Sequence, residues 1–240
     1  MLRCLPDPMS RPRLALLNAS YDDANTPRNF RRELAADLVE IDVRNHDIPD
    51  DLDVDGCVIT GSRASVYWDE PWIEPLLDWV ANADAQGLPL LGICYGHQVL
   101  AAALGGTVED MGEYELGYRS VTHSGKSKLF DGIPETFTVF TTHSDHVSAL
   151  PDGAVETAWN DYGNHGFERD NAYAVQFHPE YDMETAIAVT ERKDLPEERI
   201  EAVLADITDA NYAASCVAKQ VFDNFLYIVA SVKDAPQLSP

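Results

Sequence analysis

Residues 90–98 read Leu-Leu-Gly-Ile-Cys-Tyr-Gly-His-Gln and set a cysteine between two glycines. The apolar residues before Cys94 are typical of a buried strand, and the following run, Val99–Leu104, is typical of a helix. Gly92 and Gly96 leave room for a sharp turn and for close packing of the helix on the strand. The segment predicts a strand, a tight turn and a helix whose N-terminus points at the thiol. The alternative is a small buried cysteine at a strand end.

A second segment, residues 172–180, reads Ala-Tyr-Ala-Val-Gln-Phe-His-Pro-Glu and has the pattern of another buried strand that ends in polar groups. A cysteine nucleophile needs a base, and the base needs a group that orients it. Cys94, His178 and Glu180 can supply these three roles. Open α/β sheets place their sites at the carboxyl ends of strands, so we expect the three side chains to meet there.

The rest of the pattern predicts an α/β fold of one domain. Buried strands are expected at residues 13–19, 39–43, 54–60 and 88–94, with helices at 30–38 and 71–85. Beyond residue 104 the pattern changes to short strands separated by Gly, Asp and Pro turns, near residues 120–122, 136–141, 155–159 and 173–177. We therefore expect an open mixed, mostly parallel sheet that is flanked by helices and has a partly antiparallel edge.

The chain divides into three parts by composition. Residues 1–12 contain three prolines and are expected to form a loose lead-in, residues 13–185 the main domain, and residues 186–240 a helical extension. Within the extension, Glu197–Val229 carries apolar residues at helical spacing and is expected to form a long, kinked helix. We expect this helix to cover one face of the core; docking a partner and forming a homodimer are the alternatives.

The net charge of −24 narrows the classes of partner. So large an acidic excess repels polyphosphate, which argues against nucleic acid and anionic membranes as ligands. The acidity is spread along the chain, which is typical of proteins adapted to a salt-rich cytoplasm, and a halophilic origin is our hypothesis. The four cysteines do not form a disulfide framework, and no segment is apolar for long enough to span a membrane. These features predict a cytoplasmic protein.

Five motifs, in the same order along the chain, resemble those of the class I (triad) glutamine amidotransferases, especially stand-alone members similar to GMP synthase. The motifs occupy residues 60–62, 92–98, 113–117, 142–147 and 176–180. The resemblance implies the flavodoxin-like fold of that family. It also implies that Cys94 attacks the side-chain amide carbon of glutamine, that His178 moves the proton and that Glu180 orients His178. A thioester at Cys94 then releases glutamate to water, and the ammonia passes to an acceptor.

Attack on an amide produces an oxyanion that needs backbone donors. The N–H groups of Tyr95, directly after the nucleophile, and of Gly61, in a loop that allows close approach, are the candidates. The resemblance implies that four further residues hold or line the glutamine site. They are Gln98, His143, Ser144 and Asp145.

A metal centre is a rival hypothesis, because His143, Asp145 and His146 are crowded together. These residues fall in the pocket motif, and neither a Cys-x-x-Cys nor a His-Glu-x-x-His pattern supports a site. We therefore expect neither a metal nor a cofactor.

Departures from the family pattern leave the ammonia acceptor open. Thr60–Arg63 replaces a usual Ser-Gly-Gly-Pro, and Tyr181–Thr185 follows the histidine motif where a valine and a short His-Thr segment are usual. No Walker-type loop is visible, so we expect a separate synthetase to use the ammonia. One alternative is a γ-glutamyl peptidase or hydrolase with the same triad and a wider pocket near Arg63, Tyr67 and Trp68. Another is an inactive regulatory or interaction subunit.

Overall fold

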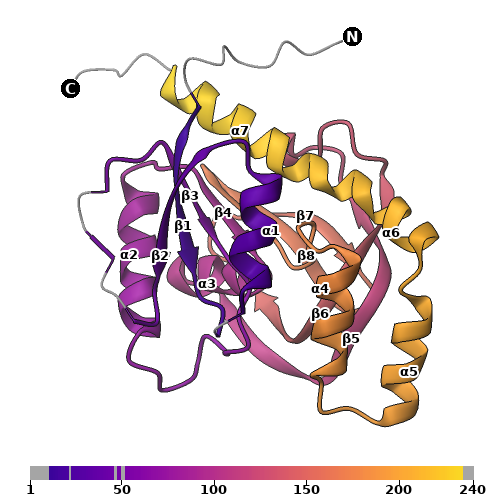
Figure 1. Ribbon diagram of the computed structural model, residues 1–240. Helices are drawn as coiled ribbons and strands as arrows, with labels where there is room; N and C mark the ends of the chain where they lie inside the picture. Colours follow the sequence, from indigo (N-terminus) through magenta and orange to yellow (C-terminus); the bar gives the residue numbers. More distant parts are fainter. Residues whose placement is uncertain (1–10, 22, 46–47, 50–51, 235–240) are drawn as a thin grey trace.

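The computed structural model describes residues 11–21, 23–45, 48–49 and 52–234, and most of the expected lead-in lies outside this part (Figure 1). The described residues form a nine-stranded sheet in the order β2-β1-β3-β4-β9-β8-β7-β5-β6. The strands are β1 (Arg13–Asn18), β2 (Asp37–Asp42), β3 (Gly56–Ile59), β4 (Leu90–Ile93), β5 (Thr107–His123), β6 (Thr136–Ala149), β7 (Val155–Asn160), β8 (Gly163–Arg169) and β9 (Ala172–Val175).

The five strands from β2 to β9 run parallel, and the remaining strands add an antiparallel part. Strands β3, β4 and β9 are buried along their whole length, as expected for parallel strands with both faces covered. Ile93 pairs with Val175 at the end of the β4–β9 ladder. Because the two strands are parallel, Cys94 and the polar segment after β9 emerge side by side at one edge of the sheet.

Helices cover both faces of the parallel part (Figure 1). On one face, α2 and α3 pack on alternate strand residues such as Ala15 and Leu17. On the other face, α1 and α7 pack on Leu14 and Leu16, the residues in between. The helices are α1 (Asn25–Glu33), α2 (Ile73–Ala85), α3 (Tyr95–Ala103), α4 (Met183–Glu191), α5 (Glu197–Asp206), α6 (Asp209–Ser215) and α7 (Gln220–Lys233).

Two local expectations differ from the structure. The helix expected at residues 30–38 is α1, which begins earlier and ends at Glu33, because Leu34 is extended and Asp37 already belongs to β2. The strands after residue 104 are longer than expected, since β5 spans 17 residues and β6 spans 14. These two strands pair as an antiparallel ribbon with an irregularity between Asp110 and Glu115. The pocket motif at 142–147 therefore lies within strand β6.

The C-terminal part consists of short helices followed by α7. The helix expected over Glu197–Val229 is divided into α5, α6, a 3₁₀ turn at Cys216–Lys219 and α7. The break falls at Thr208, whose side chain accepts a hydrogen bond from the backbone of Asn211 and begins α6. Helix α7 crosses the sheet and buries Phe225 completely (Figure 1). Within the described residues, none of the helices combines the length and the apolar composition needed to cross a membrane.

We expect Phe225→Ala to lower the free energy of unfolding by about 3–5 kcal/mol, because it removes a fully buried ring from the contact between α7 and the sheet. Tyr227→Ala is the matched control on the same helix, since 61% of Tyr227 is exposed, and should cost less than about 1 kcal/mol. Denaturant unfolding in potassium chloride measures both. Equal losses would contradict the packing of α7 on the sheet.

Candidate active site

Cys94 lies at a strained turn between β4 and α3. Its φ of 54° and ψ of −101° are unusual for a residue with a side chain. The two flanking glycines make the turn possible: a Cβ on Gly92 would lie 2.2 Å from the carbonyl oxygen of Gly96, and a Cβ on Gly96 would lie 2.3 Å from that of Ile59. The predicted strand, turn and helix are therefore present, and the glycines allow α3 to approach β3 and β4.

His178 and Glu180 follow strand β9 as a buried pair. The backbone N–H of His178 donates to the carbonyl of Phe140 in β6, which fixes where the segment leaves the sheet. The His178 Nδ1 lies 2.8 Å from Glu180 Oε1, and both side chains are almost completely buried. The N–H at Nδ1 therefore donates to the carboxylate, and Nε2 is the ring atom left to face Cys94.

Cys94 and His178 meet beside Gly61. A Cβ on Gly61 would lie 2.9 Å from His178 Cε1 and 3.7 Å from Cys94 Cβ, so only glycine fits between them. The Cys94 sulfur also contacts Gln176, whose side-chain Nε2 lies 3.6 Å away. Burial opposes a charge on His178, but its interactions with Cys94 and with the Glu180 carboxylate outweigh it and raise the pKa of His178 to about 10. The structure thus favours a charged imidazolium beside the sulfur.

All nine residues predicted for the site line a cavity of about 310 Å³. The cavity opens at the carboxyl edge of the parallel strands, between α3, β6 and the segment after β9. These residues are Gly61, Cys94, Tyr95, Gln98, His143, Ser144, Asp145, His178 and Glu180. Arg63 and Trp68, which we expected in a wider pocket, also line it, whereas Tyr67 is half exposed and bonds to Asp145 through its hydroxyl.

Asp145 connects the pocket strand to the loop that carries Gly61. Its carboxylate accepts hydrogen bonds from Ser65 Oγ at 2.5 Å and Tyr67 OH at 2.9 Å. Its backbone carbonyl accepts one from Gln98 Nε2 at 3.2 Å. The sequence did not indicate Ser65 as part of the site, because its partner is distant in the chain. Asp145 thereby holds the loop of Gly61 in place against β6.

A cluster behind the pocket joins Glu115, His143 and His165. Glu115 Oε2 lies 2.6 Å from His143 Nε2 and 3.1 Å from His165 Nε2, and Asn160 donates to the other carboxylate oxygen at 2.7 Å. His143 Nδ1 contacts the carbonyl of Asp145 at 2.9 Å. Both ring nitrogens of His143 therefore face oxygen atoms, and the ring is held between Glu115 and the backbone of β6. Burial opposes the ionisation of Glu115, but hydrogen bonds from the two histidines hold its pKa well below the usual range.

Glu115, His143 and His165 each offer a ligand atom, and these atoms lie close enough together to form a candidate cation site. The contact between Glu115 and His143 has hydrogen-bond length, whereas two atoms bound to one tetrahedral zinc ion are about 3.3 Å apart. The arrangement therefore fits a shared proton better than a metal ion. His146, which the sequence suggested as a ligand, is not part of the cluster.

The mixed sheet and its strained cysteine turn define an α/β domain of the amidotransferase type. The sequence profile of the family Glutamine amidotransferase class-I matches residues 21–193, which is most of the chain. The chain belongs to this family. The match extends beyond residue 185, where we expected the domain to end, and the position of that boundary stays a prediction.

Similar proteins carry related names. The chain is 42% identical over 129 residues to "GMP synthase [glutamine-hydrolyzing]" of Lactococcus lactis subsp. lactis, covering 52% of this chain and 24% of the relative. It is 43% identical over 128 residues to the protein of the same name from Thermobifida fusca, covering 51% and 23%. The chain therefore matches about a quarter of the length of these curated relatives.

Solved structures agree with the fold. A glutamine amidotransferase from Thermotoga maritima has a TM-score of 0.75 at 20% identity, over 90% of this chain and 99% of that one. A glutamine amido transferase from Methylobacillus flagellatus has a TM-score of 0.75 at 21% identity, over 91% and 96%. The mixed α/β sheet flanked by helices is thereby confirmed.

We expect the ring of His178 to titrate near pH 10, because the adjacent negative charges stabilise its protonated form. His97 is an internal reference, since complete burial lowers its pKa to about 4 and keeps it neutral. Histidine-selective NMR titration of the full chain measures both rings. Glu180→Gln should move the His178 midpoint to lower pH. A wild-type midpoint near the ordinary value of about 6.5 would contradict the charged pairing.

Proposed function

We propose that this protein hydrolyses the side-chain amide of glutamine and supplies the ammonia to an acceptor enzyme. Membership of the class I glutamine amidotransferases supports the reaction class. The observation that carries the proposal is the meeting of Cys94, at its strained turn, with a His178 that is oriented by Glu180. This arrangement provides a nucleophile, a proton carrier and an orienting carboxylate within one cavity.

The reaction begins with attack of the Cys94 thiolate on the side-chain amide carbon of glutamine. The backbone N–H groups of Tyr95 and Gly61 stabilise the oxyanion; that of Tyr95 is at the start of α3, where N–H groups lack partners within the helix. His178 gives its proton to the departing nitrogen, the carbon–nitrogen bond breaks, and ammonia leaves a thioester on Cys94. Water then attacks the thioester while His178 takes its proton, and glutamate departs as the thiolate re-forms.

The remaining pocket residues are proposed to hold the amino acid part of glutamine. Ser144 and the backbone of Asp145 lie on β6 beside Cys94 and line the cavity. Gln98 donates to the carbonyl of Asp145, so it also fixes the position of that strand. His143, held in place by Glu115, presents its ring at the cavity wall and is proposed to contact the amino acid part of glutamine.

A synthetase partner is proposed as the acceptor of ammonia. The curated relatives are named as glutamine-hydrolysing GMP synthases, and this chain matches about a quarter of their length.

We propose a cytoplasmic setting at high salt, supported by the net charge of −24. A homodimer that forms through the exposed helices is a separate proposal. Thermal melting in low and high potassium chloride tests the salt hypothesis, and equal stability in both would count against it.

A diazo-ketone analogue of glutamine should alkylate Cys94, because the proposed thiolate attacks the carbon at the position of the amide. Peptide mapping by mass spectrometry locates the adduct, and free glutamine should block its formation. Cys94→Ala should abolish labelling. Cys216→Ser is the matched control, because Cys216 is also a free cysteine and lies on a distant helix turn. Labelling that persists in Cys94→Ala, or that glutamine does not slow, would contradict the proposal.

A γ-glutamyl hydrolase is the second candidate, and the lining of the cavity favours it. Besides the residues predicted for the site, Val189, Arg192 and Lys193 at the C-terminal end of α4 line the cavity. Ammonia needs no such contacts, whereas the second residue of a γ-glutamyl dipeptide would use them. Lys193 donates to the Tyr114 hydroxyl there and could pair with the carboxylate of that residue.

The two candidates differ in their response to Lys193→Met. For the hydrolase we expect kcat/KM for a γ-glutamyl dipeptide to exceed that for glutamine and to fall about tenfold in this variant, with little change for glutamine. Lys126→Met is the control, because Lys126 is exposed and does not line the cavity. Steady-state assays with both substrates decide between them. A preference for glutamine that Lys193→Met leaves unchanged would exclude the hydrolase.

A further inference from the structure

The segment directly after Glu180 departs from the family pattern, and the structure gives it a contact with the site. The ring of Tyr181 stacks on the imidazole of His178, with ring centroids 4.0 Å apart and an angle of 21° between the planes. Phe140 packs against Tyr181 at 5.9 Å and supports it from β6. An aliphatic side chain at this position would offer no flat surface.

The stacked ring restricts a motion that Glu180 alone leaves open. The hydrogen bond from His178 Nδ1 fixes one point of the imidazole, about which the ring can still tilt. Gly61 approaches the ring at Cε1, and Tyr181 covers its face. With these contacts Nε2 stays directed at Cys94, which a proton carrier in this reaction requires.

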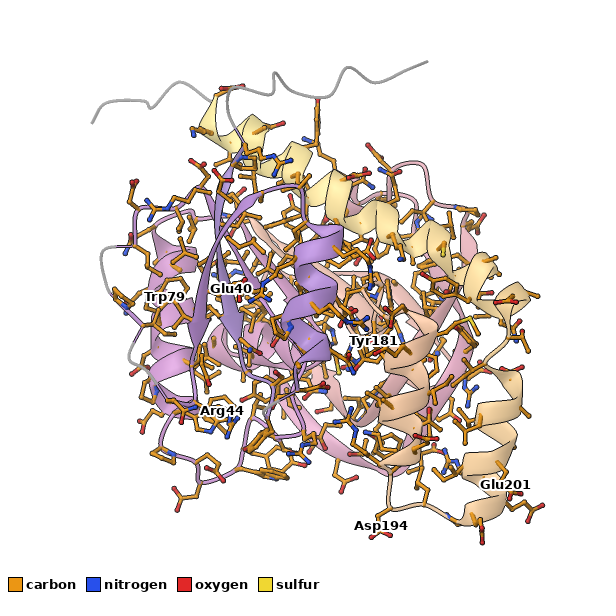
Figure 2. The ribbon with its side chains drawn as sticks, viewed as in Figure 1. Glu40, Arg44, Trp79, Tyr181, Asp194 and Glu201 are labelled. Carbon is orange, nitrogen blue, oxygen red and sulfur yellow. The ribbon has the colours of Figure 1, made fainter. Side chains whose placement is uncertain are left out.

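The backbone around Tyr181 is itself anchored to α1. Arg32 donates to the carbonyl of Glu180 at 2.6 Å and to the carboxylate of Asp182 at 2.7 Å. Arg28 donates to Asp182 at 3.1 Å, and Asp182 also accepts the backbone N–H of Thr185 at the start of α4. Figure 2 places Tyr181 in the region between α1 and α4. These hydrogen bonds fix the backbone segment that carries the Tyr181 ring.

We propose that Tyr181 is a positioning residue that holds the imidazole of His178 in the orientation that faces Cys94. The inference rests on the proposed function, since it concerns the proton carrier of that reaction. Tyr181 does not enter the chemistry; burial raises the pKa of its phenol well above the ordinary value, so the ring stays neutral. The face of a neutral aromatic ring attracts a cation, so the stack also favours the protonated form of His178.

Other titratable groups near the stacked rings of Tyr181 and His178 also affect the pKa of His178 or Tyr181. The Cys94 sulfur and the Glu180 carboxylate both face His178 and favour its imidazolium form. Asp23, before α1, and Tyr114, on β5, are the further titratable groups near Tyr181. Loss of the aromatic face should therefore lower the pKa of His178 and leave these contributions in place. In the pH profile of kcat the basic limb, which reports loss of the imidazolium, should move to lower pH.

Tyr181→Leu and Tyr181→Phe test the proposal. The leucine variant keeps an apolar side chain but loses the flat face, and we expect kcat to fall about tenfold, KM to stay within about twofold, and the basic limb to move down by about one pH unit. The phenylalanine variant keeps the stack and should restore kcat and the pH profile. Phe222→Leu, which alters a ring packed on Phe30 between α1 and α7 and does not line the cavity, is the control for loss of stability alone.

NMR titration of His178 in the same variants separates this inference from the proposed function. A lower midpoint in Tyr181→Leu, restored in Tyr181→Phe, supports the stack even if the wild type does not hydrolyse glutamine. An unchanged midpoint and an unchanged pH profile in Tyr181→Leu would overturn it. So would a loss of kcat that Phe222→Leu reproduces in full.

Discussion

The close approach of α3 to β3 and β4 is the constraint on which the rest of the site depends. It exists because Gly92 and Gly96 lack side chains, and any Cβ at either position would overlap backbone atoms of the opposing segment. The approach forces Cys94 into a φ of 54° and turns its sulfur toward the segment after β9. Strain of this kind costs about 1–3 kcal/mol and persists only where the surrounding core fixes it. Here the buried ladder between β4 and β9 does so.

Two buried contacts between a histidine and a glutamate lie at the site in a strongly acidic chain. His178 pairs with Glu180 beside the sulfur, and His143 pairs with Glu115 behind the pocket strand. A buried charge is costly unless it is paired and its remaining polar atoms are bonded. Asn160 donates to the second oxygen of Glu115, and Arg32 of α1 donates to the backbone carbonyl of Glu180, whereas the second carboxylate oxygen of Glu180 has no partner among the described residues. His178 thus brings positive charge to the cavity, although the net charge of the chain is −24.

The sequence allowed the parallel sheet, and the meeting of Cys94 with His178 and Glu180, to be predicted because these features follow from local strand patterns. Cys94 and His178 each follow an apolar strand, and parallel strands bring their ends together. Ser65 and His165 were missed because their contacts with Asp145 and Glu115 depend on the register of the β5–β6 ribbon and on β8, which no local pattern encodes. The break in the C-terminal helix could be predicted in part from the sequence, because Thr208 is a favourable N-cap that precedes an acidic residue.

The most direct test of this account is detection of the covalent intermediate. The full chain is mixed with glutamine, and in parallel with a γ-glutamyl dipeptide, quenched in acid within one turnover and mapped by mass spectrometry. The account predicts a γ-glutamyl group in thioester linkage on Cys94 with at least one of the two substrates, and none in Cys94→Ala. Turnover of either substrate by Cys94→Ala, or a γ-glutamyl group on another residue, would contradict it.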